Sequence, residues 1–416
     1  MGTFFEADGI ERAAFAGLIA AGAVLPLSLA LKDLSLGVMV LAWLVTRAGR
    51  RQPSLPRAAA TLPLLLWCGA SLLSMVNSVN LGASVGGLKK AVIATAIVVA
   101  TAALLSTPRR VILLFAAVMV GGVLASADGL VQVIRGRDLL YGRAAGIGLD
   151  VLPRLTGAFG HANDFGVYAA GVLPICIAMA LGATTRAGRR AAWGVTALLS
   201  LALALTFSRP AALGLAVGLP LFCLVRPRAQ AWGTLTMLVL LVVGGLLLLP
   251  SPVRAWVTSQ HSWFDALVLP ERPQMWRTAM NMITAHPWIG VGTNTFVLNY
   301  LRYRPPGDTL QPAYAHNHFL HMAAEIGLIG LAAFGLVVLS ALLAWRRHLR
   351  SPDERIRLLS TGMGCGLVSF LAVGLLESAL YSSHTNLCLW VWLGALHGRW
   401  PFNRLLTEQV HSGRFR

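Results

Sequence analysis

His316 and Asn317 stand at the point where a polar segment gives way to a long apolar run. An ionisable side chain at the mouth of an apolar segment is energetically costly, so such a residue is a functional candidate by default. Imidazole titrates near neutral pH and can take the proton from a hydroxyl as that hydroxyl attacks. We therefore predict that His316 is a general base. The alternative is that it only caps the following helix or binds a loop carbonyl.

Three arginines also border apolar runs, and together they predict an anion site. Arg154 opens a segment that reaches Asn163, and Arg209 lies in a short turn between two apolar runs. Arg272 and Trp276 are four residues apart, so they share one face of a helix. The guanidinium fork binds phosphate oxygens in pairs, which makes phosphate the expected ligand. Contact with lipid headgroups and loop solubility are the competing explanation for such arginines.

A second group of polar side chains follows His316 along the same predicted helix. His318, His321 and Glu325 fall at i, i+3 and i+7, on one helical face. This spacing could ligate zinc, but two histidines and a distant carboxylate on one helix make an incomplete set. We expect these side chains to orient His316 or to line an aqueous groove.

Further polar residues lie at the same predicted end of the apolar runs. His161 and Asn163 either bind substrate hydroxyls or cap the next helix, and Glu377 and His384 are placed to touch a substrate. The acidic residues of the outer loops are Asp138, Asp150, Asp265, Glu271 and Asp308. They are scattered and lack the paired spacing that holds Mg²⁺. We therefore predict no metal ion and no other cofactor.

The composition is that of an integral membrane protein. The chain has 416 residues, of which 56% are hydrophobic and 12% charged, and its mean hydropathy is +0.69. A soluble domain carries about 25% charged residues. The apolar runs are long enough to cross a hydrocarbon core of about 30 Å as helices. All five cysteines lie in these runs, without disulfide or zinc spacing.

We predict an all-α protein with about twelve transmembrane helices, and counts of about ten or eleven also fit because three runs are short. The expected spans are residues 12–31, 34–46, 60–79, 90–106, 111–134, 164–183, 191–207, 210–225, 230–250, 317–344, 358–380 and 385–398. They form a single polytopic domain over residues 1–416, with a large loop at 251–315 between the ninth and tenth spans.

Basic loops predict the orientation of these spans. If the amino terminus is cytoplasmic, the inward loops contain Arg47, Arg50, Arg51, Arg57, Arg109, Arg110, Arg186, Arg189, Arg190, Arg226, Arg228, Arg346, Arg347, Arg350, Arg355 and Arg357. Cytoplasmic loops are enriched in arginine and lysine, so both termini are expected inside and the site at the periplasmic face. The net charge of +18 then reflects topology and requires no nucleic-acid partner.

Two longer segments face outward, at 135–163 and 251–315. The first is rich in glycine and arginine and is expected to hold a short strand or turn. The second contains a predicted helix from Pro273 to Thr284, because proline suits the first helical position. Apolar side chains recur on one face of this helix, which would let it lie along the membrane surface.

Taken in order, these motifs resemble the O-antigen ligase and polymerase superfamily, a group of bacterial inner-membrane glycosyltransferases. The ligase pattern is His, then Asn, Ser or Gln, nine residues, Gly, two residues, and Gly, Thr or Tyr. In this chain the pattern is filled by His316, Asn317, Gly327 and Gly330. The pair Ser208-Arg209 and the segment 272–296 also look like the family's, so the resemblance covers roughly residues 150–335.

The resemblance implies a GT-C-type helical fold. It implies transfer of O-antigen glycan from undecaprenyl pyrophosphate to a sugar hydroxyl of lipid A–core. In that family an essential histidine matches His316, and arginines matching Arg209 and Arg272 serve the pyrophosphate. Cations against a departing pyrophosphate favour the charge-developed state. We therefore predict arginine in place of metal, and a single displacement that inverts the anomeric centre.

Two further interpretations stay open. An O-antigen polymerase or a protein O-oligosaccharyltransferase of the same superfamily shares the donor and differs in the acceptor. A flippase or another transporter of lipid-linked glycans would also need cationic residues, but along a path into the inner half of the bundle. The interior of the predicted spans is nearly free of charge away from the outer face, which favours an enzyme.

Overall fold

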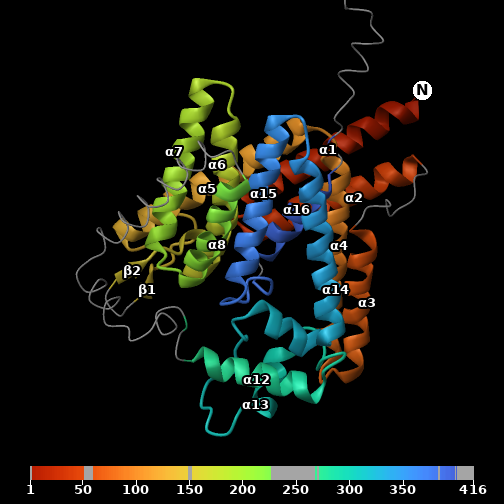
Figure 1. Ribbon diagram of the computed structural model, residues 1–416, viewed down its shortest axis with the longest axis vertical. Helices are drawn as coiled ribbons and strands as arrows, with labels where there is room; N and C mark the ends of the chain where they lie inside the picture. The colour runs from red at the N-terminus through yellow and green to blue at the C-terminus, as the bar shows by residue number, and fades with distance from the viewer. Residues whose placement is uncertain are drawn as a thin grey trace, which may run out of the picture.

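The computed structural model describes residues 2–50, 60–148, 152–225, 268, 271–382, 385–398 and 400. Almost all of this chain is α-helical (Figure 1). The predicted span at 230–250, the residue His384, most of 251–270 and the carboxyl tail lie outside the described residues.

The amino-terminal half supplies eight helices before residue 226. They are α1 (Gly2–Val24), α2 (Leu29–Gly49), α3 (Thr61–Ser74), α4 (Leu81–Leu104), α5 (Pro108–Arg135), α6 (Ala162–Gly182), α7 (Arg186–Leu205) and α8 (Arg209–Val225). A 3-10 turn, η1 (Met75–Asn77), extends α3. Between α5 and α6, the strands β1 (Gly146–Gly148) and β2 (Leu152–Arg154) pair antiparallel, and the 3-10 turn η2 (Gly157–Phe159) follows.

The carboxyl-terminal half continues with α12 (Arg272–Ala285), α13 (Phe296–Tyr303), α14 (His318–Leu349), α15 (Glu354–Val373) and α16 (Asn386–His397). Six described helices (α2, α4, α5, α6, α14 and α15) are long and apolar enough to cross a membrane. The segment 61–77 and the helices α8 and α16 are shorter apolar helices. The prediction of a multi-pass helical membrane protein is thus confirmed, with one small β-hairpin where a strand was expected, while the count of twelve stays a prediction.

Helices α6 and α15 form the centre of the bundle. In their apolar windows 83% and 78% of the residues are buried, compared with 28% in α2. Small residues let the two backbones approach, as they do between membrane helices in general. A Cβ atom on Gly366 of α15 would collide with the carbonyl oxygen of Gly171 in α6. Close packing here fixes the loops that leave both helices.

The two ends of the bundle differ in their charge. At one end Glu11 of α1 pairs with Arg50 after α2, at 2.9 Å, and with Arg110 of α5, at 3.1 Å. Figure 1 shows the α6–α7 and α14–α15 turns at the top and α12 and α13 as a layer at the bottom. Arginines lie at the start of α7 and in the last turn of α14. The basic turns therefore share one end, as the sequence predicts.

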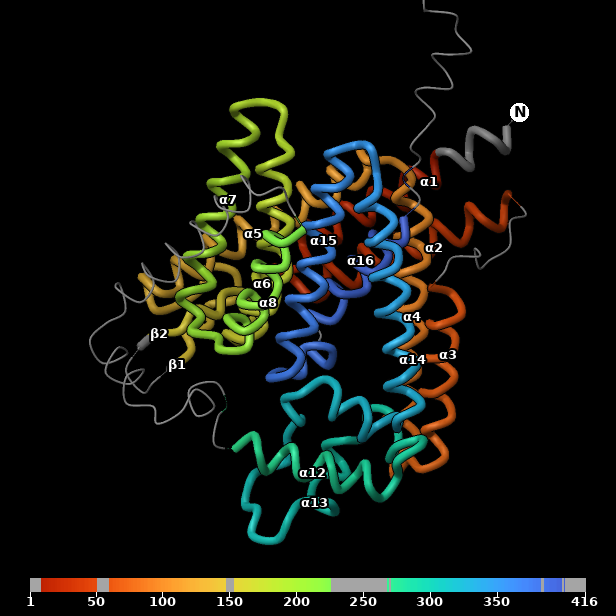
Figure 2. The backbone as a smooth tube through the Cα atoms, in the orientation of Figure 1, coloured from red at the N-terminus to blue at the C-terminus, as the bar shows by residue number. Residues whose placement is uncertain are grey.

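Helix α14 is broken at Gly327, where φ is 70° and ψ is −179°. The segment 287–292 fills the break with four backbone hydrogen bonds, which replace those that the helix loses. They join the Val291 amide to Ala324 O (2.9 Å), Gly292 to Glu325 O (3.0 Å), Leu328 to Pro287 O (2.8 Å) and Ile329 to Trp288 O (3.3 Å). Figure 2 shows the chain after α12 passing close to the lower part of α14 and to α3.

The glycines of the His-Asn…Gly…Gly motif serve this packing. A Cβ atom on Gly327 would collide with the Trp288 carbonyl, and one on Gly330 would collide with the side chain of Ile326. Gly327 also has a positive φ, which favours glycine. Both motif glycines are thus explained by the shape of α14 and its loop, without a role in chemistry.

Candidate functional site

Four loops and one helix of the chain meet below α14, at the end of the bundle opposite the basic turns. They are the β2–α6 segment, the α7–α8 turn, the loop after α15, the loop before α14, and the start of α12. These are the segments that carry the residues predicted from the sequence. The structure brings most of them together through Glu377.

His316 lies in the loop directly before α14. Its φ of 47° is in the left-handed region, which costs a non-glycine residue about 1–3 kcal/mol and is typical of functional sites. Asn317 is the N-cap of α14, and its Oδ1 accepts the amides of Phe319 and Leu320 at 3.0 Å each. Capping is therefore done by Asn317, and the capping alternative for His316 is wrong.

Glu377 lies in the loop after α15 and contacts three of the predicted site residues, His316, Asn163 and Arg272. Its Oε1 accepts a hydrogen bond from His316 Nδ1 at 2.7 Å, and its own neighbour Ser378 donates its amide to the same oxygen at 3.0 Å. Asn163 Nδ2 donates to Oε2 at 2.6 Å, and the Arg272 guanidinium lies 3.8 Å from that oxygen. The carboxylate is 7% exposed, so these contacts replace its hydration.

These contacts settle the protonation state of Glu377. Burial alone would raise its pKa, but the hydrogen bond and charge of His316, the charge of Arg272 and the Ser378 amide lower the pKa to about 2. An ionised carboxylate only accepts hydrogen bonds, so Nδ1 of His316 carries the hydrogen. When this imidazole is neutral its lone pair is on Nε2, which makes no hydrogen bond within the described chain.

Arg272 is the first residue of α12 and is only 3% exposed. Its Nε and Nη1 atoms have no hydrogen-bond partner among the described residues. Burial lowers its pKa, and the nearby charge of Glu377 opposes that effect. Burying a guanidinium with two nitrogens that donate no hydrogen bond costs free energy, unless a bound anion accepts hydrogen bonds from those nitrogens.

Arg154 and Arg209 complete a cationic cluster with Arg272. Arg154 Nε donates to the Thr206 carbonyl at 2.7 Å, and its Nη2 donates to Asn163 Oδ1 at 3.2 Å. The charges of Arg154 and Arg272 both act on Arg209, at the start of α8. Arg272 and Arg154 both interact with the Glu377 charge, and Arg209 interacts with both of these arginines, so the cluster has an excess of positive charge that fits an anionic ligand.

Other unused polar atoms lie on the residues beside this cluster. Trp276 is one turn beyond Arg272 on α12, and its Nε1 is buried without a partner in the described structure. The Ser208 hydroxyl, next to Arg209, is likewise buried and unpartnered there. Buried donors without partners are rare in folded proteins, and each calls for an explanation such as a ligand.

The side chains of His318, His321 and Glu325 pack between α14 and its neighbouring segments. His318 is fully buried against the Phe370 ring, and His321 stacks on Phe296 at 4.3 Å. Glu325 accepts the amides of Asn294 and Phe296 at 2.9 Å each, at the start of α13. Among the described residues no group of three metal-ligating side chains gathers. Glu325 and His321 hold the α13 loop on α14, His321 Nδ1 also accepts the amide of Ala315, next to His316, at 3.4 Å, and Glu325 lines a pocket.

Sequence reasoning named Glu377 but placed it against a substrate, whereas it joins His316, Asn163 and Arg272. The sequence offers no signal for these partners, because 61 residues separate Glu377 from His316. Reasoning from the sequence missed Asp164, which hydrogen-bonds Ser382 and so ties the start of α6 to the Glu377 loop. His384 cannot be placed because it lies outside the described residues.

A known protein family matches the segment of this chain that carries several of the site residues. Residues 194–335 match the family model described as O-Antigen ligase. The curated proteins contain no match to this chain. A chain from a solved peptidoglycan synthase complex, which coordinates polymerization and crosslinking, is 20% identical, with 85% of this chain and 98% of that chain covered and a TM-score of 0.42. The family match spans Arg209, Arg272 and His316, and it supports the O-antigen ligase and polymerase superfamily for this helical membrane protein.

Proposed function

We propose that this protein is a glycosyltransferase that moves an O-antigen glycan from undecaprenyl pyrophosphate to a sugar hydroxyl of lipid A–core. The observation that carries this proposal is the buried guanidinium of Arg272, with two unused nitrogens, beside the His316–Glu377 pair. An anion site and a general base lie together, which is what displacement of a pyrophosphate by an alcohol requires.

In this proposal the arginine cluster binds the pyrophosphate of the donor. Arg272, Arg209 and Arg154 neutralise the charge that grows on the leaving group as the glycosidic bond breaks. The bidentate fork suits two phosphoryl groups better than a single ammonium would. Trp276 and Ser208 add hydrogen-bond donors at the edge of the arginine cluster. Because guanidinium groups supply the positive charge, we propose that the transfer needs no metal ion.

His316 is the proposed general base. Its Nε2 takes the proton from the acceptor hydroxyl while that oxygen attacks the anomeric carbon, and the donor pyrophosphate departs from the other side. One displacement of this kind inverts the anomeric centre. Glu377 holds the imidazole in the tautomer that leaves Nε2 unprotonated, and it stabilises the imidazolium that forms, as the carboxylate of a catalytic triad does.

The placement of the site in the cell follows from the charges. We propose that the basic turns face the cytoplasm of a bacterium, with both termini, and that the arginine cluster faces the periplasm. The loop 251–315 would then cover the site from outside as part of one polytopic domain with a GT-C-type architecture. Donor and acceptor would both reach it from the outer leaflet of the inner membrane.

Reconstitution with separate acceptors tests this function. Purified protein in liposomes is given undecaprenyl-pyrophosphate-linked glycan with lipid A–core, a glycan repeat on the same lipid carrier, or an acceptor protein. We expect a covalent product with lipid A–core, and we expect EDTA to leave the rate unchanged. Product with only the glycan repeat or only the protein would make it a polymerase or a protein O-oligosaccharyltransferase. Transbilayer movement of donor without any product would make it a transporter.

A further inference from the structure

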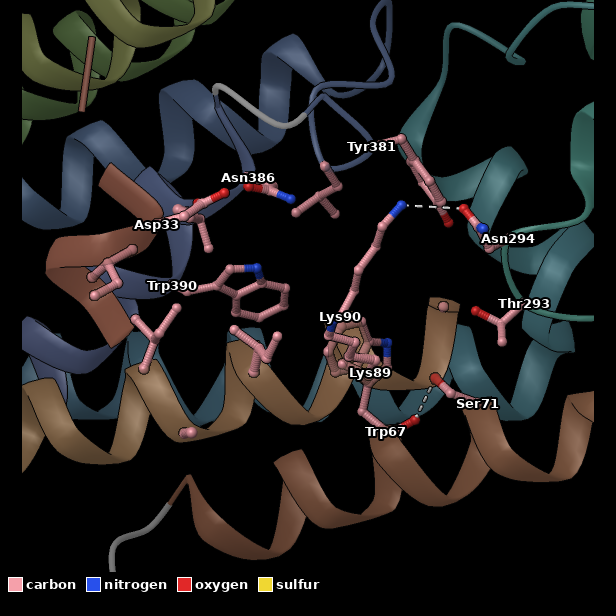
Figure 3. Close-up of a pocket in the computed structure, with 18 of the residues that line it drawn as sticks. Asp33, Trp67, Ser71, Lys89, Lys90, Thr293, Asn294, Tyr381, Asn386 and Trp390 are labelled. Carbon is pink, nitrogen blue, oxygen red and sulfur yellow. Dashed lines mark hydrogen bonds between the residues drawn. The ribbon is translucent and has the colours of Figure 1, made fainter. Parts of the chain in front are cut away.

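A pocket separate from the arginine cluster lies between α2, α3, α4, α14 and α16. Its volume is about 620 Å³, within the usual range of ligand pockets, which is about 300–1,000 Å³. Figure 3 shows Trp67 and Trp390 on its walls, and their rings are 5.0 Å apart. None of Arg154, Arg209, Arg272 or His316 lines it.

The pocket opens on an apolar surface of the bundle. Leu41 and Leu44 of α2 and Ile93 of α4 line it, and they are 65%, 43% and 44% exposed. Both helices are long and apolar enough to cross a membrane. An opening edged by exposed aliphatic side chains on two such helices faces hydrocarbon and not water. Its occupant therefore carries an alkyl or acyl chain.

The charged residues that line the pocket are Lys32, Asp33, Lys89, Lys90 and Glu325, and Glu325 already accepts the amides of Asn294 and Phe296. Lys89 and Lys90 lie about 12 Å along α4 from its start, inside an otherwise apolar span. Lys90 Nζ donates to Asn294 Oδ1 at 3.2 Å, as Figure 3 shows, and no described carboxylate pairs with either lysine. Lys32, by contrast, has Asp33 at 3.5 Å. Unpaired lysines on a membrane helix mark a functional contact, and ammonium groups bind phosphate.

A short chain of rings connects this pocket to the general base. Tyr381 lines the pocket, and its ring centroid lies 6.3 Å from that of Tyr314. Tyr314 is two residues before His316, and Tyr381 is four residues after Glu377. The pocket therefore ends beside the loops that carry His316 and Glu377, and none of the three arginines lines it.

We propose that this pocket holds the lipid end of the acceptor, an acylated glycolipid that carries phosphate. Its acyl chains lie between α2 and α4, and Lys89 and Lys90 bind a phosphate of its headgroup. The sugar chain then extends past Tyr381 and Tyr314 to His316. This inference rests on the proposed function, in which the arginine cluster is already occupied by the donor pyrophosphate and a second lipid-anchored partner must approach separately.

Photo-crosslinking within α4 tests the occupant directly. A diazirine amino acid replaces Ile93, which lines the pocket, or Val92, which is 53% exposed but does not line it. The intact protein in nanodiscs receives labelled lipid A–core or labelled undecaprenyl pyrophosphate. We expect lipid A–core to label the Ile93 position well above the Val92 position, and its dephosphorylated form to compete poorly. Equal labelling at both positions, or selective labelling of position 93 by undecaprenyl pyrophosphate, would overturn the proposal.

Steady-state kinetics give a second readout. The double variant Lys89→Gln/Lys90→Gln should raise KM for lipid A–core roughly tenfold, the effect of one lost charged hydrogen bond, with kcat and donor KM unchanged. Arg135→Gln, an exposed cation at the end of α5, is the control and should change neither. An unchanged acceptor KM contradicts the proposal. Selective labelling at position 93 without any covalent product would reject the proposed function alone, whereas product without selective labelling would reject the pocket alone.

Discussion

Glu377 bonds to partners that arrive from three different elements: His316 before α14, Asn163 on α6 and Arg272 on α12. Its carboxylate therefore sets both the tautomer of the base and the position of one phosphate-binding arginine. A residue with this arrangement acts on the reaction through its neighbours. It is a positioning residue in our account, and His316 touches the substrate.

Replacing Glu377 by glutamine tests that role. Glutamine keeps the shape but removes the charge that stabilises the protonated imidazole, so the base stays unprotonated to lower pH. We expect the acid side of the pH–rate profile to move to lower pH and the maximal rate to fall about tenfold or more. The pKa of Glu377 is about 2, so this carboxylate stays ionised over the assayed pH range. Its own titration therefore does not shape the pH–rate profile.

The control is Glu354→Gln, at the start of α15 and the opposite end of the bundle, which should leave the profile unchanged. A Glu377→Gln protein with the wild-type rate and profile would show that this carboxylate is only structural.

Arg272 offers a test of bidentate binding. Lysine keeps the positive charge but loses the planar fork. We expect Arg272→Lys to lower kcat/KM for the donor roughly thirtyfold, which corresponds to about 2 kcal/mol for one charged hydrogen bond. Arg277→Lys, an exposed position on the same helix, is the matched control. Equal kinetics for both variants would remove Arg272 from the anion site.

At the scale of elements, the break in α14 positions His316. The four backbone bonds at the break clamp segment 287–292 against the helix, and the helix that carries Arg272 leads directly into that segment. Main-chain contacts therefore hold α14, around Gly327, to the segment that directly follows α12. This explains why the motif combines a histidine with glycines nine and more residues away.

Replacing Gly327 by alanine tests whether the break in α14 has a structural role. Gly327→Ala forces a side chain into a left-handed backbone and against Trp288, so we expect a loss of about 1–3 kcal/mol in stability and a matching loss of activity. Gly335→Ala, on the same helix with open space around it, should be neutral or slightly stabilising. Thermal unfolding of both variants in one detergent measures the difference. A Gly327→Ala protein with the wild-type Tm would contradict the clamp.

Hydropathy located the long helices well, but some boundaries differ for physical reasons. The helix α4 begins at Leu81, although residue 90 was expected, because Asn80 caps it and the Lys90 ammonium group finds a hydrogen-bond acceptor in Asn294. The helix α15 ends at Val373, before the expected residue 380, and this frees Glu377 for the site. The eight-residue α13 was not predicted because it depends on contacts with Glu325.

The sequence allowed most site residues to be selected by their chemistry, but it did not predict which of them contact each other. Arginine chemistry and the imidazole selected Arg154, Arg209, Arg272 and His316, and hydropathy put them at one end of the bundle. The sequence carried no sign that Glu377 would lie 2.7 Å from His316, because 61 residues separate them and only tertiary packing brings them together. The pocket beside Lys89 and Lys90 was missed for the same reason.

At the scale of the whole molecule, the basic turns lie at one end of the bundle and the site with its arginine cluster lies at the other. Single cysteines test which side each end faces. In a background with the five native cysteines replaced, Arg302→Cys lies on α13 at the site end and Arg350→Cys follows α14 at the basic end. We expect a membrane-impermeant maleimide added to intact spheroplasts to label position 302 only. Labelling of position 350 instead would invert the proposed topology.

The most direct test of the account measures transfer itself in the His316→Ala protein. Wild-type and variant enzymes are reconstituted with undecaprenyl-pyrophosphate-linked glycan and lipid A–core, after equal thermal unfolding shows that both are folded. Loss of a general base typically costs about 100-fold to 10,000-fold in rate, and we predict a loss in that range for the variant. A His316→Ala protein that forms product at the wild-type rate would contradict the central claim.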